Sequence, residues 1–377
     1  MGALPCLLVR CLGIHEYPES DGKRCRSCSR KVPIKESTNV ATIKDVAARA
    51  GVGMSTASRV VSGKGYVAAA TIERVQKAIE ELDFRPSHAA RALMSGSSQM
   101  VGVYIPILKG TFYTPILAAI DAELRAADLH MVVAFGVGKG DARRQAVEGI
   151  DFLLERGCDG VIAISNHLCD EDVLALGKNQ ARIVFLNHLL PSIAAHCFTA
   201  DHNYGGVLAA RALLEQGHRK IAVIGGPQSS PDNLARLSGF MGELERFGID
   251  PARVWQSESD FSPEAGWAAA VRLLDSSYQF SAVFCANDEI AVGAMAYFQE
   301  MGREVPRNIS VIGYDDTPSA AFSSPRLTSV RIPWLEMTMA ALDDLFNRCY
   351  GTKRVIDRNF PVSITQRASL AGPPGPV

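Results

Sequence analysis

Short apolar runs alternate with amphipathic segments from residue 99 onward, and this rhythm limits the folds open to the chain more than any other feature. The apolar runs have strand length, and the segments between them carry apolar residues at helical spacing. The runs lie at 101–107, 131–135, 160–164, 182–186, 221–224, 282–285 and 309–312, with helical segments at 116–127, 207–215, 234–247 and 290–301. Strands that alternate with helices pair in parallel. We therefore expect residues 99–377 to form a doubly wound α/β body of two similar lobes.

A chain of 377 residues exceeds what a single hydrophobic core usually supports, which predicts at least two folding units. Hydrophobic residues make up 47% of the sequence and charged residues 21%, as in ordinary soluble proteins. No apolar run is long enough to cross a bilayer, and Pro5 and Arg10 interrupt the apolar stretch near the start. The nine cysteines form no disulfide-like pattern. We expect a cytoplasmic protein that does not bind a membrane.

The first 38 residues contain a Cys-x-x-Cys pair, Cys25 and Cys28, with two further cysteines upstream. A zinc knuckle is one interpretation of this group. The spacing matches no standard zinc finger, however, and prolines interrupt a segment that has no hydrophobic periodicity. We therefore expect residues 1–38 to form a disordered extension that holds no metal.

Charge is distributed unevenly along the chain. Residues 1–95 carry 15 Lys and Arg residues against 9 Asp and Glu residues, whereas the remaining 24 basic residues face 31 acidic ones. The first part is therefore basic and the second acidic, although the formal net charge of the whole chain is only −1. This division is typical of a domain that contacts DNA phosphates, joined to a sensor that does not.

A sharp helical pattern begins with the capping-box sequence Thr42–Asp45, and apolar residues follow it at helical spacing up to a break at 51–53 that contains two glycines. A second helical segment covers 54–61 and a third covers 69–82. Two short helices joined by a tight glycine-containing turn are the signature of a DNA-binding helix-turn-helix, and an ordinary helical hairpin is the alternative. We expect a three-helix DNA-binding head over 39–86.

The second of these helical segments has an outward face suited to base contacts. Its inner side carries Ala57, Val60 and Val61. The outer side carries short or hydrogen-bonding side chains, among which an arginine can hold a guanine or a phosphate through two hydrogen bonds. The residues expected to contact DNA from the head are Thr42, Met54, Ser55, Ser58 and Arg59. A solvated surface is the alternative for this face.

The head is followed by a segment that is too short to form a stable helix alone. Pro86 ends the third helical segment, Ser87 can cap residues 88–94, and residues 95–98 have the composition of a flexible joint. We therefore expect a hinge helix and linker over 87–98.

Polar side chains follow several of the predicted strands of the body. Because ligands bind beyond the carboxyl ends of parallel strands, these side chains are candidates for a ligand site. An arginine fork, a carboxylate and amides suit the hydroxyls of a sugar, and aromatic rings suit its apolar face. The polar candidates are Asn187, Asn287, Asp315 and, early on a helix, Arg236; the aromatic candidates are Phe112, Tyr113, Phe261 and Trp334. Core packing is the alternative for each aromatic residue.

Several stretches resemble the LacI/GalR family of bacterial transcription regulators. They are Ala41–Val52, Ser58–Val61, Phe84–Pro86 and Arg91–Leu93 in the first part, and Asn203–Gly206, Ala286–Met295, Ile309–Asp316 and Pro325–Val330 in the body. The resemblance implies a two-lobed body like that of periplasmic binding proteins. It also implies a repressor that binds a pseudo-palindromic operator as a homodimer and responds to a small-molecule effector, a sugar or a sugar acid.

The resemblance assigns roles to individual residues as well. It implies that residues 87–94 become helical on operator DNA, where Leu93 inserts between base steps of the minor groove and Ala90 contacts the duplex. The effector contacts that it implies are Arg236, Asn287 and Asp315, with Trp334 stacked on the ligand. Both an inducer and a co-repressor are compatible with this pattern.

Two other classes of protein share parts of the pattern. A binding protein for solute uptake would have the same two-lobed body, but it would carry an export signal and lack the helical segments of 42–94. An enzyme is suggested only by the glycine-rich stretch 136–140, which lacks both the dinucleotide-binding spacing and the lysine-hydroxyl ending of a phosphate loop. No catalytic triad or metal-ligand spacing is visible. We therefore predict a DNA-binding regulator that is not an enzyme and needs no cofactor.

Overall fold

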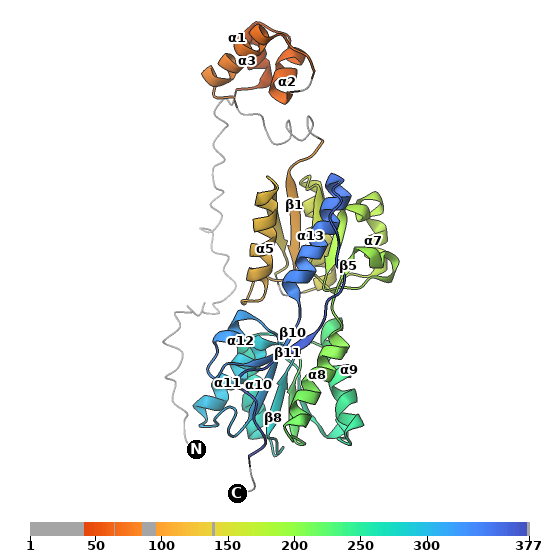
Figure 1. Cartoon of the computed structure of the whole chain (residues 1–377), viewed down its shortest axis with the longest axis vertical. Helices are drawn as coiled ribbons and strands as arrows, with labels where there is room; N and C mark the ends of the chain where they lie inside the picture. Colours follow the sequence, from red (N-terminus) through yellow and green to blue (C-terminus); the bar gives the residue numbers. More distant parts are fainter. Residues whose placement is uncertain (1–40, 64, 85–95, 138–139, 375–377) are drawn as a thin grey trace, which may run out of the picture. The chain divides into compact units, whose positions relative to one another are not determined.

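The computed structural model describes residues 41–63, 65–84, 96–137 and 140–374, and the chain divides into two compact units (Figure 1). The first unit ends at Pro86 and the second begins at Ser87. The predicted N-terminal extension, the hinge helix and the candidate zinc cysteines lie outside the described residues.

The first unit is a head of three helices, α1 (Ile43–Ala50), α2 (Met54–Ser62) and α3 (Ala69–Glu81). The predicted capping box starts α1: the backbone N–H of Thr42 donates to Asp45 at 2.8 Å, and the backbone N–H of Asp45 donates back to the Thr42 hydroxyl at 3.4 Å. Gly51 ends α1 in the left-handed region, with φ of 64°, which glycine adopts without strain. The small core consists of Val46, Ala47, Ala50, Ala57, Val75, Ala78 and Phe84.

The N-terminal lobe of the second unit contains a parallel five-stranded sheet in the order β2-β1-β3-β4-β5. Its strands are β1 (Met100–Ile105), β2 (His130–Phe135), β3 (Gly160–Ala163), β4 (Ile183–Leu186) and β5 (Cys197–Phe198). Its helices are α5 (Tyr113–Ala126), α6 (Ala142–Glu155) and α7 (Asp170–Ala175), with short 3₁₀ helices at Gly177–Arg182 and Pro191–His196.

The C-terminal lobe contains a six-stranded sheet in the order β11-β10-β9-β8-β6-β7, parallel except for β11. Its strands are β6 (Ile221–Ile224), β7 (Trp255–Ser257), β8 (Ala282–Cys285), β9 (Ser310–Asp315), β10 (Thr328–Arg331) and β11 (Ser363–Thr365). Its helices are α8 (His202–Glu215), α9 (Pro231–Arg246), α10 (Pro263–Asp275), α11 (Asp288–Glu300) and α12 (Pro318–Phe322), with a 3₁₀ helix at Pro251–Arg253. The predicted fold class is confirmed for both units.

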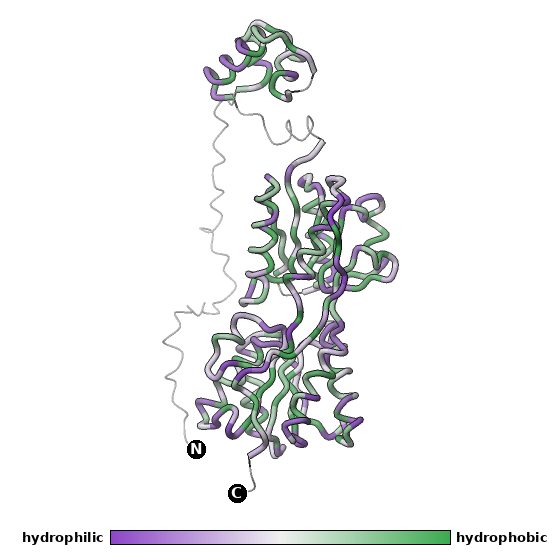
Figure 2. Tube along the Cα trace, viewed as in Figure 1, coloured by the Kyte–Doolittle hydropathy of each residue, from purple (hydrophilic) through white to green (hydrophobic). Residues whose placement is uncertain are grey.

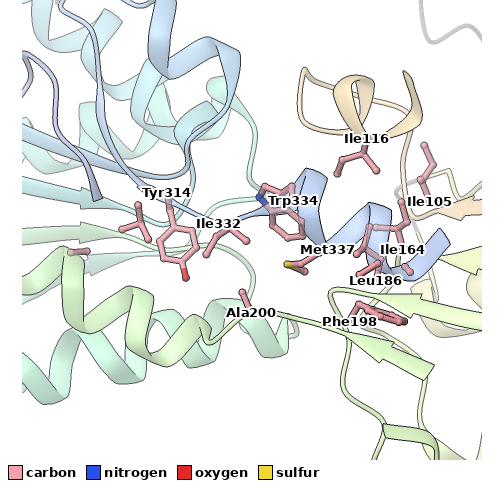
Figure 3. Packing of buried hydrophobic residues seen from close by; sticks show 14 of the residues in the cluster. Ile105, Ile116, Ile164, Leu186, Phe198, Ala200, Tyr314, Ile332, Trp334 and Met337 are labelled. Carbon is pink, nitrogen blue, oxygen red and sulfur yellow. The ribbon is translucent and has the colours of Figure 1, made fainter. Parts of the chain in front are cut away.

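The chain passes between the lobes three times, after β5, after β10 and after α13 (Trp334–Tyr350). Helix α13 follows strands of the C-terminal lobe in sequence, yet it packs on α5 and on β3, β4 and β5 of the N-terminal lobe (Figure 1). A single hydrophobic cluster therefore extends through both lobes. Figure 3 shows part of it, with Ile332, Trp334 and Met337 lying between Tyr314 on one side and Leu186 on the other.

Apolar residues are concentrated along the strands and the inner sides of the helices, whereas hydrophilic residues predominate on outer turns (Figure 2). Helices α8 and α9 approach each other as closely as glycine allows. A Cβ atom at Gly206 would lie 2.0 Å from the backbone oxygen of Arg236, and one at Gly239 would lie 1.9 Å from the backbone oxygen of Asn203. This packing fixes the part of α9 that carries Arg236. Within the ranges that the structure describes, no helix is long and apolar enough to cross a membrane.

Candidate functional sites

The outward face of α2 is the candidate DNA-contact surface of the head. Met54 begins the helix and is 59% exposed, and Ser55 and Arg59 are exposed as well. Ser58 is partly buried, while Ala57 fills the core behind it. Four of the predicted contact residues therefore lie on one helix away from the core, as a recognition helix requires.

The fifth residue predicted from the head has a structural role already. Thr42 is exposed, but its hydroxyl donates to the Asp45 carboxylate at 2.7 Å as part of the α1 cap. These hydrogen bonds from Thr42 lower the pKa of Asp45. Ala90 and Leu93, predicted to contact the minor groove, lie outside the described residues.

Arg236 is the centre of a second candidate site, between the two lobes of the body. Its side chain is only 3% exposed, and the guanidinium lies 4.1 Å from the centre of the Tyr314 ring. One terminal nitrogen donates to the backbone oxygen of Ala286 at 2.6 Å. The other donates to Asp232 at 3.1 Å and lies 3.5 Å from Asp315. Arg236 is therefore shared by two carboxylates.

Asp315, the last residue of β9, is 7% exposed. Burial raises its pKa to about 6, against the opposing effects of the nearby Arg236 charge and of the Trp334 indole N–H. Its Oδ1 atom has no hydrogen-bond partner, nor do Nε of Arg236 and Nε1 of Trp334. These three atoms are the only buried side-chain nitrogen or oxygen atoms without a partner in the described parts of the chain. Since buried polar groups are normally hydrogen-bonded, their concentration at one place is a strong sign of a ligand site.

Asn187, just after β4, belongs to the opposite side of the site. Its amide nitrogen donates to Asp232 at 3.1 Å, and its amide oxygen accepts from Nε2 of His202 at 2.6 Å. The hydroxyl of Tyr314 completes this path by donating to Nδ1 of His202 at 3.1 Å. Burial and the positive charge of Arg236 lower the pKa of His202 to about 3, so the imidazole is neutral, as these two hydrogen bonds require.

Asp232 connects the lobes directly. Its carboxylate accepts from Asn166 and Asn187, which follow strands of the N-terminal lobe, and from Ser230 and Arg236 of the C-terminal lobe. The nearby charge of Arg236 holds the pKa of Asp232 below its usual value, although burial opposes this. Sequence reasoning missed this residue, because the expected helix began at 234, whereas α9 begins at Pro231 and places Asp232 one turn before Arg236.

Asn287 and Phe261 lie together on the C-terminal lobe. The Asn287 side chain caps α11 by accepting from the N–H of Ile290 at 2.8 Å, and it donates to the backbone oxygen of Phe261 at 3.1 Å. The Phe261 ring lies 5.9 Å from the Arg236 guanidinium. Both hydrogen-bonding atoms of the Asn287 amide are therefore engaged, and a ligand contact from this residue stays a prediction.

Three of the predicted effector residues have backbone conformations that non-glycine residues rarely adopt. The φ angles of Asn187, Phe261 and Asp315 are 60°, 65° and 98°. Each such conformation costs on the order of 1–3 kcal/mol and persists only where the surroundings enforce it. The three residues come from separate segments of the chain, so several of the strained backbone positions of the body are near Arg236.

The remaining aromatic candidates, Phe112, Tyr113 and Trp334, lie near the Asp315 carboxylate. Phe112 packs edge-on against Trp334 and Tyr113, with ring centres 4.8 and 4.9 Å apart. Burial and the charges of Asp232 and Asp315 raise the pKa of Tyr113. Phe112, Trp334 and Asp315 border a cavity of about 340 Å³, whose wall also includes Ile116, Thr317 and Phe322. This volume is within the range of small-molecule sites, but neither Arg236 nor Asn187 lines the cavity, so it covers only the Asp315 and Trp334 side of the site.

Comparisons with known proteins agree with both units. A family model described as bacterial regulatory proteins, lacI family, matches residues 42–87, and one for a periplasmic binding protein-like domain matches residues 210–370. The transcriptional regulator AscG of Escherichia coli K12 is 33% identical over 337 residues, which cover 88% of this chain and 99% of that protein. The repressor PurR of Klebsiella pneumoniae is 31% identical over 340 residues, covering 89% and 98%.

Solved structures give the same result. A LacI-family transcriptional regulator from Burkholderia phymatum is 49% identical, with a TM-score of 0.70, and covers 72% of this chain and 99% of its own. A lac repressor dimer bound to operator and the anti-inducer ONPF is 29% identical, with a TM-score of 0.74, over 88% of this chain and 100% of that one.

A helix-turn-helix head joined to a two-lobed binding body defines a ligand-responsive DNA-binding regulator. The chain belongs to the lacI family of bacterial regulatory proteins. It is a transcription regulator and not an enzyme, which confirms the predicted class.

Proposed function

We propose that this regulator is a repressor that binds a pseudo-palindromic operator as a homodimer, in the cytoplasm, and that a small molecule bound between the lobes controls its hold on DNA. The DNA-binding part uses α2 of the head (39–86), continued by a hinge and linker over 87–98. The operator-bound lac repressor dimer, similar to this chain over 88% of its length, supports this arrangement. The exposure of Met54, Ser55 and Arg59 supports it independently.

The observation that carries the effector site is the set of three buried atoms without partners. Leaving such an atom unsatisfied costs about 1–3 kcal/mol. The Trp334 indole N–H lies near enough to Asp315 to lower the pKa of that carboxyl, but neither Nε1 of Trp334 nor Oδ1 of Asp315 completes a hydrogen bond. Both atoms, and Nε of Arg236, can therefore bond to a ligand. A hydroxyl group supplies both a donor and an acceptor, and the rings of Phe112 and Trp334 suit the apolar face of a sugar. The effector is therefore a sugar or sugar derivative.

The charges around the site favour a neutral sugar over a sugar acid. Arg236 faces both Asp232 and Asp315, so its charge is already compensated. An anionic ligand would be repelled by the two carboxylates, and the guanidinium that could attract it is already paired with them. The solved complex of the transcriptional regulator CelR with cellobiose, which is 29% identical to this chain, supports a neutral sugar as the ligand.

The experiment starts with full-length protein and a duplex selected from a random pool. Neutral sugars, their acids and their phosphates are then screened by thermal shift, because a ligand that binds only the folded protein raises the unfolding temperature. Trp334→Phe removes the Nε1 donor but keeps a ring, whereas Trp267→Phe makes a comparable change at a ring that packs on Tyr297.

We expect Trp334→Phe to weaken binding of the screened ligand by about tenfold and Trp267→Phe to leave it unchanged. Equal affinities in the two variants would contradict the assignment of the site. Gel shifts with the same ligand then determine whether it lowers or raises the affinity for DNA. Release from DNA identifies an inducer, and tighter binding identifies a co-repressor. A protein that selects no duplex from the pool would refute the DNA-binding part.

A further inference from the structure

The linker that precedes β1 is bound to the body through one carboxylate, that of Asp159. The backbone N–H groups of Ser98 and Gln99 donate to its two oxygens at 2.8 and 3.0 Å. The hydroxyls of Ser97 and Ser98 donate to the same oxygens at 2.5 and 3.1 Å. Three consecutive linker residues are thus attached to a side chain that lies immediately before β3.

The linker follows a conformation that this carboxylate supports. Gln99 has a φ of 59°, in the left-handed region, and this turn allows two successive N–H groups to converge on Asp159. The turn is unfavourable for a residue with a side chain, so it depends on the hydrogen bonds that it makes. Without the carboxylate, we expect residues 97–99 to lose this fixed path.

The last two residues of α13 also form hydrogen bonds with Asp159. The Tyr350 hydroxyl donates to Oδ2 of Asp159 at 3.1 Å, and the thiol of Cys349 donates to the Asp159 backbone oxygen at 3.4 Å. Tyr350 is the last residue of α13, and Trp334, with its unpartnered indole nitrogen, is the first. The helix has 17 residues, which is a rod of about 25 Å. One rigid element therefore joins the proposed effector site to the linker anchor.

We propose that Asp159 and Tyr350 are the positioning residues that couple the effector site to the hinge: a shift of α13 caused by the ligand at Trp334 moves Tyr350, and with it the carboxylate that holds residues 97–99. This inference rests on the proposed function, since it assumes that the ligand binds between the lobes. It adds the route by which that ligand changes the geometry of the DNA-binding part. The coupling travels through one helix and one hydrogen-bonded carboxylate, which are contiguous in the structure.

The first test examines the anchor alone, in the full-length protein. Asp159→Asn removes the charge, and Asp141→Asn is the matched control, because Asp141 is a carboxylate of the same lobe that caps α6 by accepting from the N–H of Arg144 at 3.0 Å. We expect Asp159→Asn to speed amide hydrogen exchange at residues 97–99 by about tenfold or more and to weaken binding to the selected duplex roughly tenfold. The control should change both by less than about twofold. Wild-type exchange at 97–99 in Asp159→Asn would overturn the proposal.

The second test examines the route along α13 and needs neither operator nor ligand. Trp334→Leu changes the packing at the start of the helix, and Tyr350→Phe removes the hydrogen bond at its end. We expect Trp334→Leu to alter exchange at 97–99 in the wild-type background but not in the Tyr350→Phe background. Equal effects in the two backgrounds would show that α13 does not carry the signal.

Failure of either test can be distinguished from failure of the proposed function. A protein that selects no duplex or binds no sugar refutes the proposed function. Hydrogen exchange at residues 97–99 can still be measured and interpreted in that case, because it needs neither duplex nor sugar. Circular dichroism of each variant shows whether it has folded. If Trp334→Leu does not fold, Trp334→Phe without ligand replaces it, with the same two expected outcomes.

Discussion

Replacing Asp315 with asparagine is expected to stabilise the ligand-free protein at neutral pH, although the residue lies at the centre of the proposed effector site. The carboxylate is 7% exposed, one of its oxygens has no partner, and the Arg236 nitrogen nearest to it is 3.5 Å away. Burial therefore penalises the charged form more than Arg236 stabilises it. The result is a pKa of about 6, compared with 3.8 for an unperturbed aspartate.

The size of the effect follows from this difference in pKa. Because the folded protein binds the Asp315 proton more tightly than the unfolded chain does, the ionised carboxylate lowers the free energy of unfolding. This penalty is absent well below pH 3.8, grows as the pH rises, and is complete above about pH 6. It reaches at most about 3 kcal/mol at pH 7.5 and about 1 kcal/mol at pH 4.5. Asparagine has a similar shape and no charge, so it avoids the penalty.

The assay is urea unfolding of wild type and Asp315→Asn at pH 7.5 and 4.5. We expect the variant to be more stable by about 1–3 kcal/mol at pH 7.5 and by about 1 kcal/mol or less at pH 4.5. Asp316→Asn is the control, because that neighbouring carboxylate lies 2.6 Å from Arg367 and accepts from the Thr365 hydroxyl at 2.7 Å. The control should be destabilised by about 1–3 kcal/mol. An Asp315→Asn protein that is destabilised like the control, at both pH values, would refute the reasoning.

Other predictions concern both units. Effector binding to wild type should weaken as the pH falls below about 6, because the ligand hydroxyl donates to ionised Asp315; isothermal titration at pH 7.5 and 5 measures this, and an unchanged affinity would argue against the contact. Arg59→Ala should weaken operator binding about tenfold to hundredfold in gel shifts, whereas Arg49→Ala, at a residue paired on the surface of the head, should have a much smaller effect. Gly239→Ala should force α8 and α9 apart, since its Cβ would lie 1.9 Å from the Asn203 backbone oxygen, and lower the free energy of unfolding by about 1–3 kcal/mol or more; a wild-type melting temperature would contradict the packing.

The head could be predicted almost completely from the sequence because its structure is determined by local signals. The capping box at Thr42, the glycines of the turn and the apolar spacing on each helix all act within a few residues of one another. The predicted helices 54–61 and 69–82 differ from α2 and α3 by one residue at one end. The outward face of α2 followed directly, since burial of Ala57 determines which side chains point away.

The body was predicted less completely because its connections are not local. The main strands of both lobes were visible as apolar runs, but β5, β7, β10 and β11 were not. Strands β5, β7 and β11 have only two or three residues, and three of the four residues of β10 are polar. Nor does any local signal place α13 in the N-terminal lobe. That choice depends on the apolar face that α5 and β3–β5 leave to be covered, which exists only after the sheet has formed.

The proposed effector site shows why its residues were only partly predictable. Strand ends pointed to Asn187, Asn287 and Asp315. The residues that link the lobes were harder to find, because Asp232 lies on α9 well beyond the end of β6, and His202 follows β5, which has only two residues. The head satisfies every local preference that was used to predict it, whereas the body departs from such preferences around Arg236, with strained φ angles and buried atoms that lack partners. A folded protein retains such departures only where they serve another purpose. They make the ligand-free site costly, so a hydroxyl ligand that satisfies them gains affinity, and α13, which begins within this site, is where that gain can act on the rest of the molecule.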